Sequence, residues 1–145
     1  MTDPLDSELI QNLVKHFSRL ERRQKHFMND SLKSSGLHGM MYKYIITVKR
    51  HPGTSQDFLA EFHSVDKSRV ARVVRDLEKM GCLSRTANEN NRRCYMLSLT
   101  SEGERLFEMI QQVLVEWGKR ISKDIPGKNI IVTAETIEKM ISNAD

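Results

Sequence analysis

Basic side chains recur between positions 67 and 75 at steps of two and three residues. They are Lys67, Arg69, Arg72 and Arg75, with Ser68 beside them. On a helix this spacing places them opposite an apolar stripe made of Val70, Val73, Val74 and Leu77. The major groove of DNA admits one helix, and the arginine fork matches the O6 and N7 acceptors of guanine. We expect Lys67, Ser68, Arg69 and Arg72 to contact base edges or adjacent phosphates and Arg75 to contact phosphate; a solvated charged face is the alternative.

Two smaller groups of residues have related chemistry. Arg92 and Arg93 follow an asparagine-rich turn, from which a guanidinium can enter a minor groove, although a merely solvated turn is the alternative. Thr54, Ser55 and Gln56 begin a short predicted helix whose free amides can hold a phosphate; a plain N-cap is the alternative.

Other chemistries find little support in the sequence. The histidines are scattered without metal-ligand spacing, so we expect no metal: His16, His26, His38, His51 and His63. Cys82 and Cys94 have no Cys-x-x-Cys spacing, and buried structural thiols are favoured over a redox switch. We find no Ser-His-Asp set, nucleotide-binding glycine loop or paired-carboxylate motif, so we expect neither an enzyme nor a resident cofactor.

The positive charge is concentrated in one part of the chain. The segment from Asp66 to Arg93 holds eight basic and four acidic residues, which accounts for the whole net charge of +4. A localised cationic surface attracts a polyanion, so double-stranded DNA is the expected partner. No apolar run approaches the roughly 18 residues of a membrane span, and we expect a cytoplasmic protein that binds no membrane.

The predicted elements that position these residues are mostly helices. Ser7 is expected to cap a long helix, and Pro52 to follow a second one that begins near Leu37. Thr54 is expected to cap a short helix and Asp66 to cap the next, which ends at Gly81; a short turn between two capped helices indicates a helix-turn-helix. The apolar face of the short helix is predicted to be Phe58, Leu59 and Phe62.

The remaining segments predict a hairpin and two further helices. Tyr95, Leu97 and Leu99 alternate with other residues at a period of two, which indicates a β-hairpin behind the second helix of the motif, that is, a wing. Ser101 is expected to cap a long helix, and Thr133 a last short one. The predicted fold class is therefore mainly α with a small β-wing.

Three runs carry a resemblance to a known family: Val65-Asp66-Lys67-Ser68-Arg69-Val70, Leu77 to Arg85, and Arg92-Arg93 followed by Leu97 to Gly103. In these runs and in its order of elements, the chain resembles the MarR family of winged helix-turn-helix regulators over nearly its whole length. The resemblance implies a single domain over 1–145, with a DNA-binding part at 37–100 and helical dimerisation parts at 5–33 and 101–145. Where the family usually has an aspartate two residues before the wing arginine, this chain has Asn91 before Arg93.

The apolar stripes at both ends of the chain predict contact with a partner helix. We expect dimer contacts from Ile10, Leu13, Phe17, Leu114, Trp117, Ile137, Met140 and Ile141. The resemblance implies a homodimer on a palindromic operator, acting as a repressor and released by a small aromatic or anionic ligand. The alternatives are a helical sensor or scaffold whose winged motif binds a protein, and a non-specific chromosome-binding protein.

Overall fold

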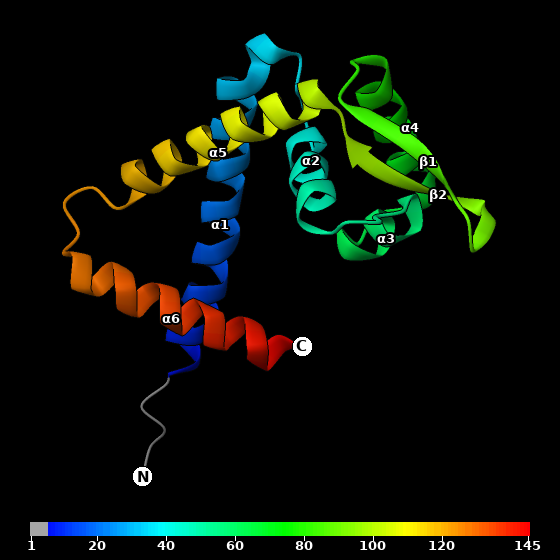
Figure 1. The fold of residues 1–145 in the computed structure, drawn as a ribbon. Coiled ribbons are helices and arrows are strands. Elements are labelled where there is room, and N and C mark those ends of the chain that lie inside the picture. The colour runs from blue at the N-terminus through cyan, green and yellow to red at the C-terminus, as the bar shows by residue number, and fades with distance from the viewer. Residues whose placement is uncertain (1–5) are drawn as a thin grey trace. The chain divides into compact units, whose positions relative to one another are not determined.

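The computed structural model describes residues 6–145, except for the side chain of Arg92, so the prediction for that side chain lies outside the described residues. The described chain is mainly helical with a two-stranded antiparallel sheet, which confirms the predicted fold class (Figure 1). It divides into two compact units, one ending at Val113 and the other running from Leu114 to Asp145. We describe each unit by itself.

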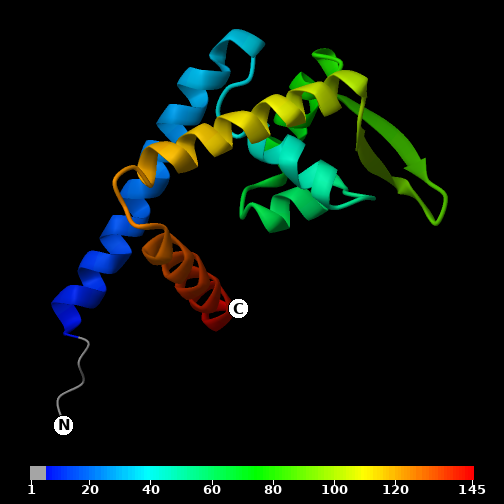
Figure 2. The ribbon, with the colours of Figure 1, turned by 60° about the vertical axis from the view of Figure 1, so that its left-hand side comes forward.

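The first unit contains the winged helix-turn-helix. Its elements are α1 (Ser7–Leu32), the 3-10 helix η1 (Lys33–Ser35), α2 (Met41–Arg50), α3 (Gln56–Phe62), α4 (Lys67–Lys79), β1 (Leu83–Asn88), β2 (Asn91–Leu99) and the first part of α5 (Ser101–Ile121). The turn between β1 and β2 projects beyond α3 and α4 in both ribbon views (Figures 1 and 2). The tip of the hairpin therefore projects as a wing behind α4.

Three predicted N-caps are each wrong by one residue. The side chain of Asp6, not Ser7, accepts the Glu8 amide at the start of α1. Ser55, not Thr54, accepts the Phe58 amide at the start of α3, and the Thr100 hydroxyl, not that of Ser101, accepts the Gly103 amide at the start of α5. In each pair both residues have a side chain that can cap a helix, and the helix begins one residue earlier or later than the pattern suggests.

Helices α2, α3 and α4 all contribute side chains to the core of the first unit. Its fully buried side chains include Tyr44 and Ile45 of α2, Leu59 of α3, and Val70 and Leu77 of α4. The predicted apolar face of α3 is wrong for its two aromatic residues. Phe58 is 36% exposed and Phe62 is 53% exposed, whereas Leu59 and Ala60 face the core. With only seven residues, α3 presents a narrow inner face that Leu59 and Ala60 fill.

The wing is anchored where it meets α4 and α5. β1 pairs with β2 from Leu83↔Leu99 to Asn88↔Asn91, with an irregularity at Ala87/Asn88. Gly81, with φ +74°, turns the chain out of α4, as a left-handed residue after a helix does. Gly103 packs so closely that an added Cβ would lie 2.2 Å from the Cys82 carbonyl oxygen. The first turn of α5 thus lies directly against the base of the wing.

The second unit consists of the end of α5 and α6 (Gly127–Ala144). Helix α6 begins six residues before the predicted cap, since Thr133 lies inside the helix and its hydroxyl donates to the Asn129 carbonyl at 2.7 Å. The prediction of a short helix capped by Thr133 is therefore wrong. No residue of α6 is buried.

Candidate nucleic-acid interface

Helices α3 and α4 form the predicted helix-turn-helix. The connection from His63 to Asp66 is tight: Ser64 has φ +52°, and the Val65 amide donates to the Ala60 carbonyl at 3.0 Å. Asp66 caps α4 as predicted, because its carboxylate accepts the Arg69 amide at 2.8 Å. The Ser68 hydroxyl also donates to Asp66, and this bond, followed by the Arg69 amide, lowers the pKa of the Asp66 carboxyl. The start of α4 is thus fixed by its own cap.

The two faces of α4 differ sharply in burial and charge. Val70, Val74 and Leu77 are 0% exposed, which anchors the helix in the core. The opposite side presents exposed side chains of the residues predicted to contact DNA: Lys67, Ser68, Arg69, Arg72 and Arg75. The structure therefore brings these five residues together on an open surface.

The cations of this surface fall into two groups. Lys67 forms an ion pair with Asp57 of α3 at 3.0 Å, and Arg85 of β1 pairs with Glu78 of α4. Arg69, Arg72 and Arg75 form no ion pair with any residue that the structure describes, and neither does Arg93 of the wing. Two cations are therefore matched within the protein, and four guanidinium groups are open to an external anion.

The wing holds its arginine through the backbone. The Arg93 amide donates to Asn91 Oδ1 at 3.2 Å, and the Asn90 amide donates to Asn88 Oδ1 at 3.0 Å. Arg85 lies with its guanidinium carbon 5.8 Å from the centre of the Tyr95 ring, within cation–π range. Asn91 thus shapes the turn through a backbone contact, and the Arg93 side chain is exposed.

A cavity of about 260 Å³ separates α3 from the wing. Its lining residues come from the start of α3 and from both strands: Ser55, Gln56, Asp57, Arg85, Arg93, Cys94 and Tyr95. Ser55 and Gln56, two of the residues predicted to hold a phosphate, line this cavity. Thr54 does not, because it is 3% exposed and its hydroxyl donates to the His51 carbonyl. A buried hydroxyl in this position holds the turn before α3 and has little surface to offer DNA.

Sequence reasoning missed His63 and Tyr44 beneath the motif. His63 Nε2 lies 2.9 Å from Thr47 Oγ1, whose hydroxyl also lies 2.9 Å from the Lys43 carbonyl. With the Thr47 hydroxyl donating to the Lys43 carbonyl, the Thr47 oxygen accepts a hydrogen bond from His63, and Nε2 is then the protonated ring nitrogen. The His63 and Tyr44 rings pack with centres 5.0 Å apart. Burial, and then the charge of Lys43, lowers the pKa of His63. His63 thus connects the turn of the motif to α2 through its contacts with Thr47 and Tyr44. No spacing pattern in the sequence involves His63, so these contacts could not be predicted from it.

Exposed apolar side chains cover much of α1. The set comprises Leu9, Ile10, Leu13, Val14, Phe17 and Leu20, which are 38–59% exposed. Three of the predicted dimerisation residues belong to it. Surface of this kind on consecutive turns is typical of a face that packs against another molecule.

The second unit has a similar surface on α6. Ile130, Ile131, Val132 and Ile141 are 37–61% exposed, and Ile137 and Met140 are partly exposed. On α5, Leu114 is partly exposed, but Trp117 is only 9% exposed in the single chain. The dimer contact predicted for Leu114 and Trp117 stays a prediction.

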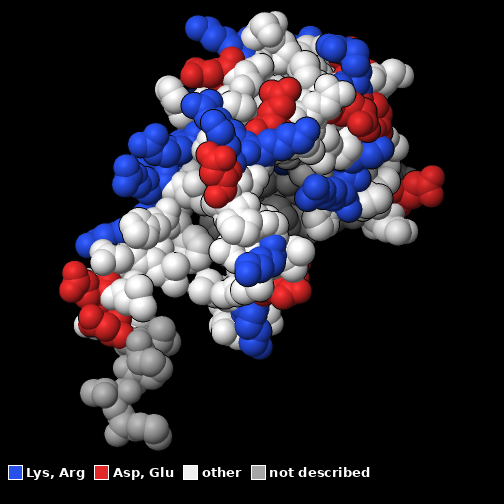
Figure 3. Space-filling model, turned by 90° about the vertical axis from the view of Figure 1, so that its left-hand side faces the viewer, with Lys and Arg blue, Asp and Glu red and all other residues white. Residues whose placement is uncertain are grey.

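Charges of both signs are interspersed on the face of the molecule seen in Figure 3. Within residues 6–145, no group of three or more His, Cys, Asp or Glu residues is placed to hold a metal ion. Cys82 is buried and Cys94 partly buried, and both are free thiols. None of the helices in the described part of the chain combines the length and apolar character of a membrane span.

Comparison with known proteins points to regulators of transcription. The model of the MarR family matches residues 41–95, from α2 into β2. The chain is 27% identical to the HTH-type transcriptional regulator BilQ of Clostridioides difficile (strain CD3), over 81% of this chain and 75% of that protein. It is 31% identical to BilQ of Clostridium symbiosum (strain WAL-14163), over 66% of each chain. A crystal structure of a MarR transcriptional regulator from Methanosarcina mazei Go1 superposes with a TM-score of 0.86 at 22% identity, covering 92% of this chain and 96% of that one.

Proposed function

Because this chain belongs to the MarR family of winged helix-turn-helix transcriptional regulators, we propose that it represses transcription by binding a palindromic operator as a homodimer. A member of this family is a DNA-binding regulator and not an enzyme. The proposal adds the dimer, the symmetry of the site, the direction of regulation and the residues that read the DNA.

The observation that carries the proposal is the division of α4 into two faces. One face is held in the core by side chains that are 0% exposed, so the helix is a rigid platform. The other presents Arg69, Arg72 and Arg75, which form no ion pair with any residue that the structure describes. Arginine forks on a fixed helix suit base edges in the major groove, and we assign base reading to Arg69 and Arg72. We assign contacts with base edges or adjacent phosphates to Lys67 and Ser68. Arg75 then contacts phosphate.

The surrounding elements supply contacts that position the helix. Ser55 and Gln56 at the start of α3, and exposed Arg93 on the wing, lie around one cavity. We propose that Ser55 and Gln56 contact phosphate and that Arg93 reaches the backbone or the adjacent minor groove. Contacts of this kind fix the orientation of the helix without reading the sequence.

The exposed apolar faces of α1 and α6 support a homodimer. Each leaves several large aliphatic or aromatic side chains open to solvent, and such surface is costly in a monomer. A second copy of the chain is the partner that a two-fold symmetric operator requires. We assign the contact to Ile10, Leu13 and Phe17 of α1 and to Ile137, Met140 and Ile141 of α6.

A small anionic or aromatic effector is part of the proposal. Arg85, Arg93 and Tyr95 line the cavity between α3 and the wing, and this set offers positive charge and a ring face to such a ligand. A ligand there would occupy the surface that contacts DNA, so its binding and DNA binding would oppose each other.

Selection of bound fragments from a random DNA pool tests the proposal. The expected result is a palindrome whose half-sites lie about 10 base pairs apart, bound about 1,000-fold or more tightly than scrambled DNA. Placing that palindrome over a promoter should then lower transcription in vitro when the protein is added. Failure to enrich any sequence would contradict sequence-specific binding, and increased transcription would contradict repression.

A further inference from the structure

We propose that Asp57 competes with DNA for Lys67 and thereby weakens the grip of α4 on any phosphate backbone. This inference rests on the proposed DNA-binding function. It assigns a role to an acidic residue that lies among the cations of the interface.

The ion pair joins the two helices of the motif. Asp57 lies in the first turn of α3, and Lys67 is the first residue of α4; Asp57 Oδ1 and Lys67 Nζ are 3.0 Å apart. The two side chains remain 64% and 76% exposed. An ion pair this open to water is weak, so Lys67 can leave Asp57 at small cost when a phosphate approaches.

Asp57 differs from the other acidic partner at this surface. Glu78 and Arg85 form a pair whose side chains are only 26% and 35% exposed, and Arg85 also lies over Tyr95. That pair braces the wing. The Asp57–Lys67 pair, by contrast, holds a lysine that we assign to DNA.

Among the described residues that line the cavity between α3 and the wing, Asp57 is also the one acidic residue. Its neighbours there include Arg85 and Arg93. A DNA phosphate drawn to these arginines therefore meets the Asp57 carboxylate as well. The carboxylate opposes DNA in two ways, because it occupies Lys67 and repels the phosphate.

Removing the charge should strengthen DNA binding. Asp57→Asn keeps the shape of the side chain and frees Lys67, so we expect binding to tighten about 1.5- to 5-fold, the range of weak exposed ion pairs. Because Lys67 reaches the phosphate in both proteins, the gain comes from the competing carboxylate alone and should shrink as salt screens that charge.

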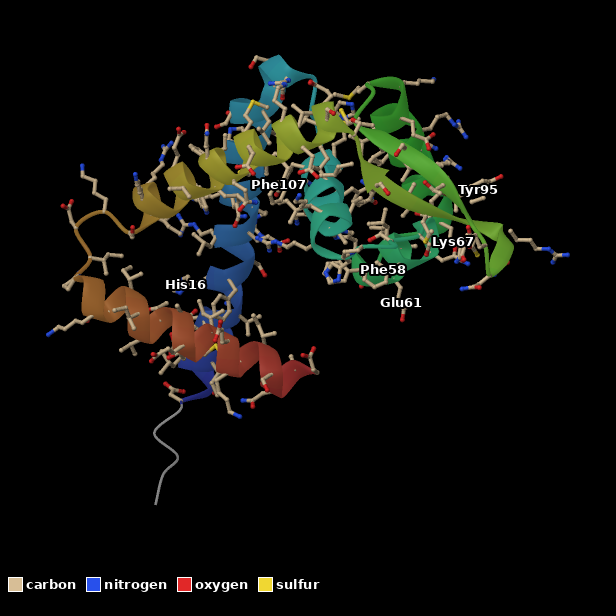
Figure 4. All side chains as sticks on the ribbon, in the orientation of Figure 1. His16, Phe58, Glu61, Lys67, Tyr95 and Phe107 are labelled. Carbon is tan, nitrogen blue, oxygen red and sulfur yellow. The ribbon has the colours of Figure 1, made fainter. Side chains whose placement is uncertain are left out.

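Glu61→Gln is the matched control. Glu61 lies on the same helix as Asp57 and loses the same charge on substitution, but it has no ion pair with any residue that the structure describes. It is seen on the side of α3 away from the wing in Figure 4. Lys67→Met, alone and combined with Asp57→Asn, completes the set.

Fluorescence anisotropy on a selected operator and on random DNA, at three salt concentrations, measures the effect. The proposal expects Asp57→Asn to bind more tightly than Glu61→Gln, and expects this advantage to shrink in the Lys67→Met background, where only the direct repulsion of the phosphate remains. Equal gains for Asp57→Asn and Glu61→Gln, a gain that is as large without Lys67 as with it, or no gain would each overturn the inference while leaving DNA binding intact. If the wild-type protein binds neither DNA, the proposed function fails and the inference fails with it. Urea unfolding of each variant verifies that the folds are equivalent.

Discussion

Replacing Arg72 by alanine separates base reading from simple attraction to DNA. Arg72 is exposed on the outer face of α4 and has no ion pair with any residue that the structure describes, so its loss should change the free energy of unfolding by no more than about 0.5 kcal/mol. Any large effect on DNA binding is then a direct effect on the contact.

The expected magnitude follows from the geometry of the contact. A good arginine–guanine pair discriminates against the wrong base by about 1–3 kcal/mol, which corresponds to about 5- to 150-fold in affinity. A homodimer carries two such contacts, so the loss on the operator should reach about 30-fold or more if the two contribute independently. On random DNA the same substitution removes only electrostatic attraction, and the loss should be several-fold.

Anisotropy titrations of wild-type protein, Arg72→Ala and Arg75→Ala on operator and random DNA provide the assay. Arg75→Ala serves as the control, because a phosphate contact should weaken both DNAs by a similar factor. Equal losses of Arg72→Ala on operator and random DNA would refute the assignment of base reading to Arg72.

Three other predictions concern the dimer, the pH dependence and the base of the wing. Phe17→Glu should give monomers in sedimentation while Ser18→Glu, its exposed neighbour, stays dimeric; a dimeric Phe17→Glu would remove α1 from the interface. Because the pKa of His63 is lowered in the folded state, its contribution to stability is fully present above the unfolded pKa of about 6.5 and is lost as pH falls from there toward the folded pKa. At pH values below 6.5, the urea midpoint should thus decrease with falling pH less steeply in His63→Gln than in the wild type. Identical plots of urea midpoint against pH would contradict this. Gly103→Ala should destabilise the protein by about 1–3 kcal/mol, because the added Cβ would overlap the Cys82 carbonyl. Gly118→Ala has open space around its Cβ and should stabilise the helix by about 0.5–1 kcal/mol. Equal urea midpoints for the two variants would exclude the close contact at Gly103.

The sequence was sufficient to predict the fold class and the main helix of the interface. The valine stripe and the cap at Asp66 locate α4, since both are local signals within a few residues. The alternation around Leu97 likewise predicts the wing. Each of these patterns depends on the chain's own periodicity and needs no knowledge of distant contacts.

What the sequence did not predict depends on contacts between elements or on small shifts of the backbone. Thr54 and Ser55 satisfy the same capping rule, and only the fold shows that Thr54 is buried and Ser55 caps α3. The aromatic residues of α3 match a helical apolar face, yet the short helix buries Leu59 and exposes Phe62. The Asp57–Lys67 pair crosses a turn of the chain, so no spacing rule for a single helix could reveal it.

Methylation interference on a selected operator tests the central claim most directly. Methylation of guanine N7 blocks the acceptor that an arginine on α4 would read in the major groove. The account predicts two clusters of interfering guanines, one in each half-site and about 10 base pairs apart, with the signal weakened in Arg72→Ala. Undiminished binding to DNA methylated throughout the site would contradict major-groove reading by α4.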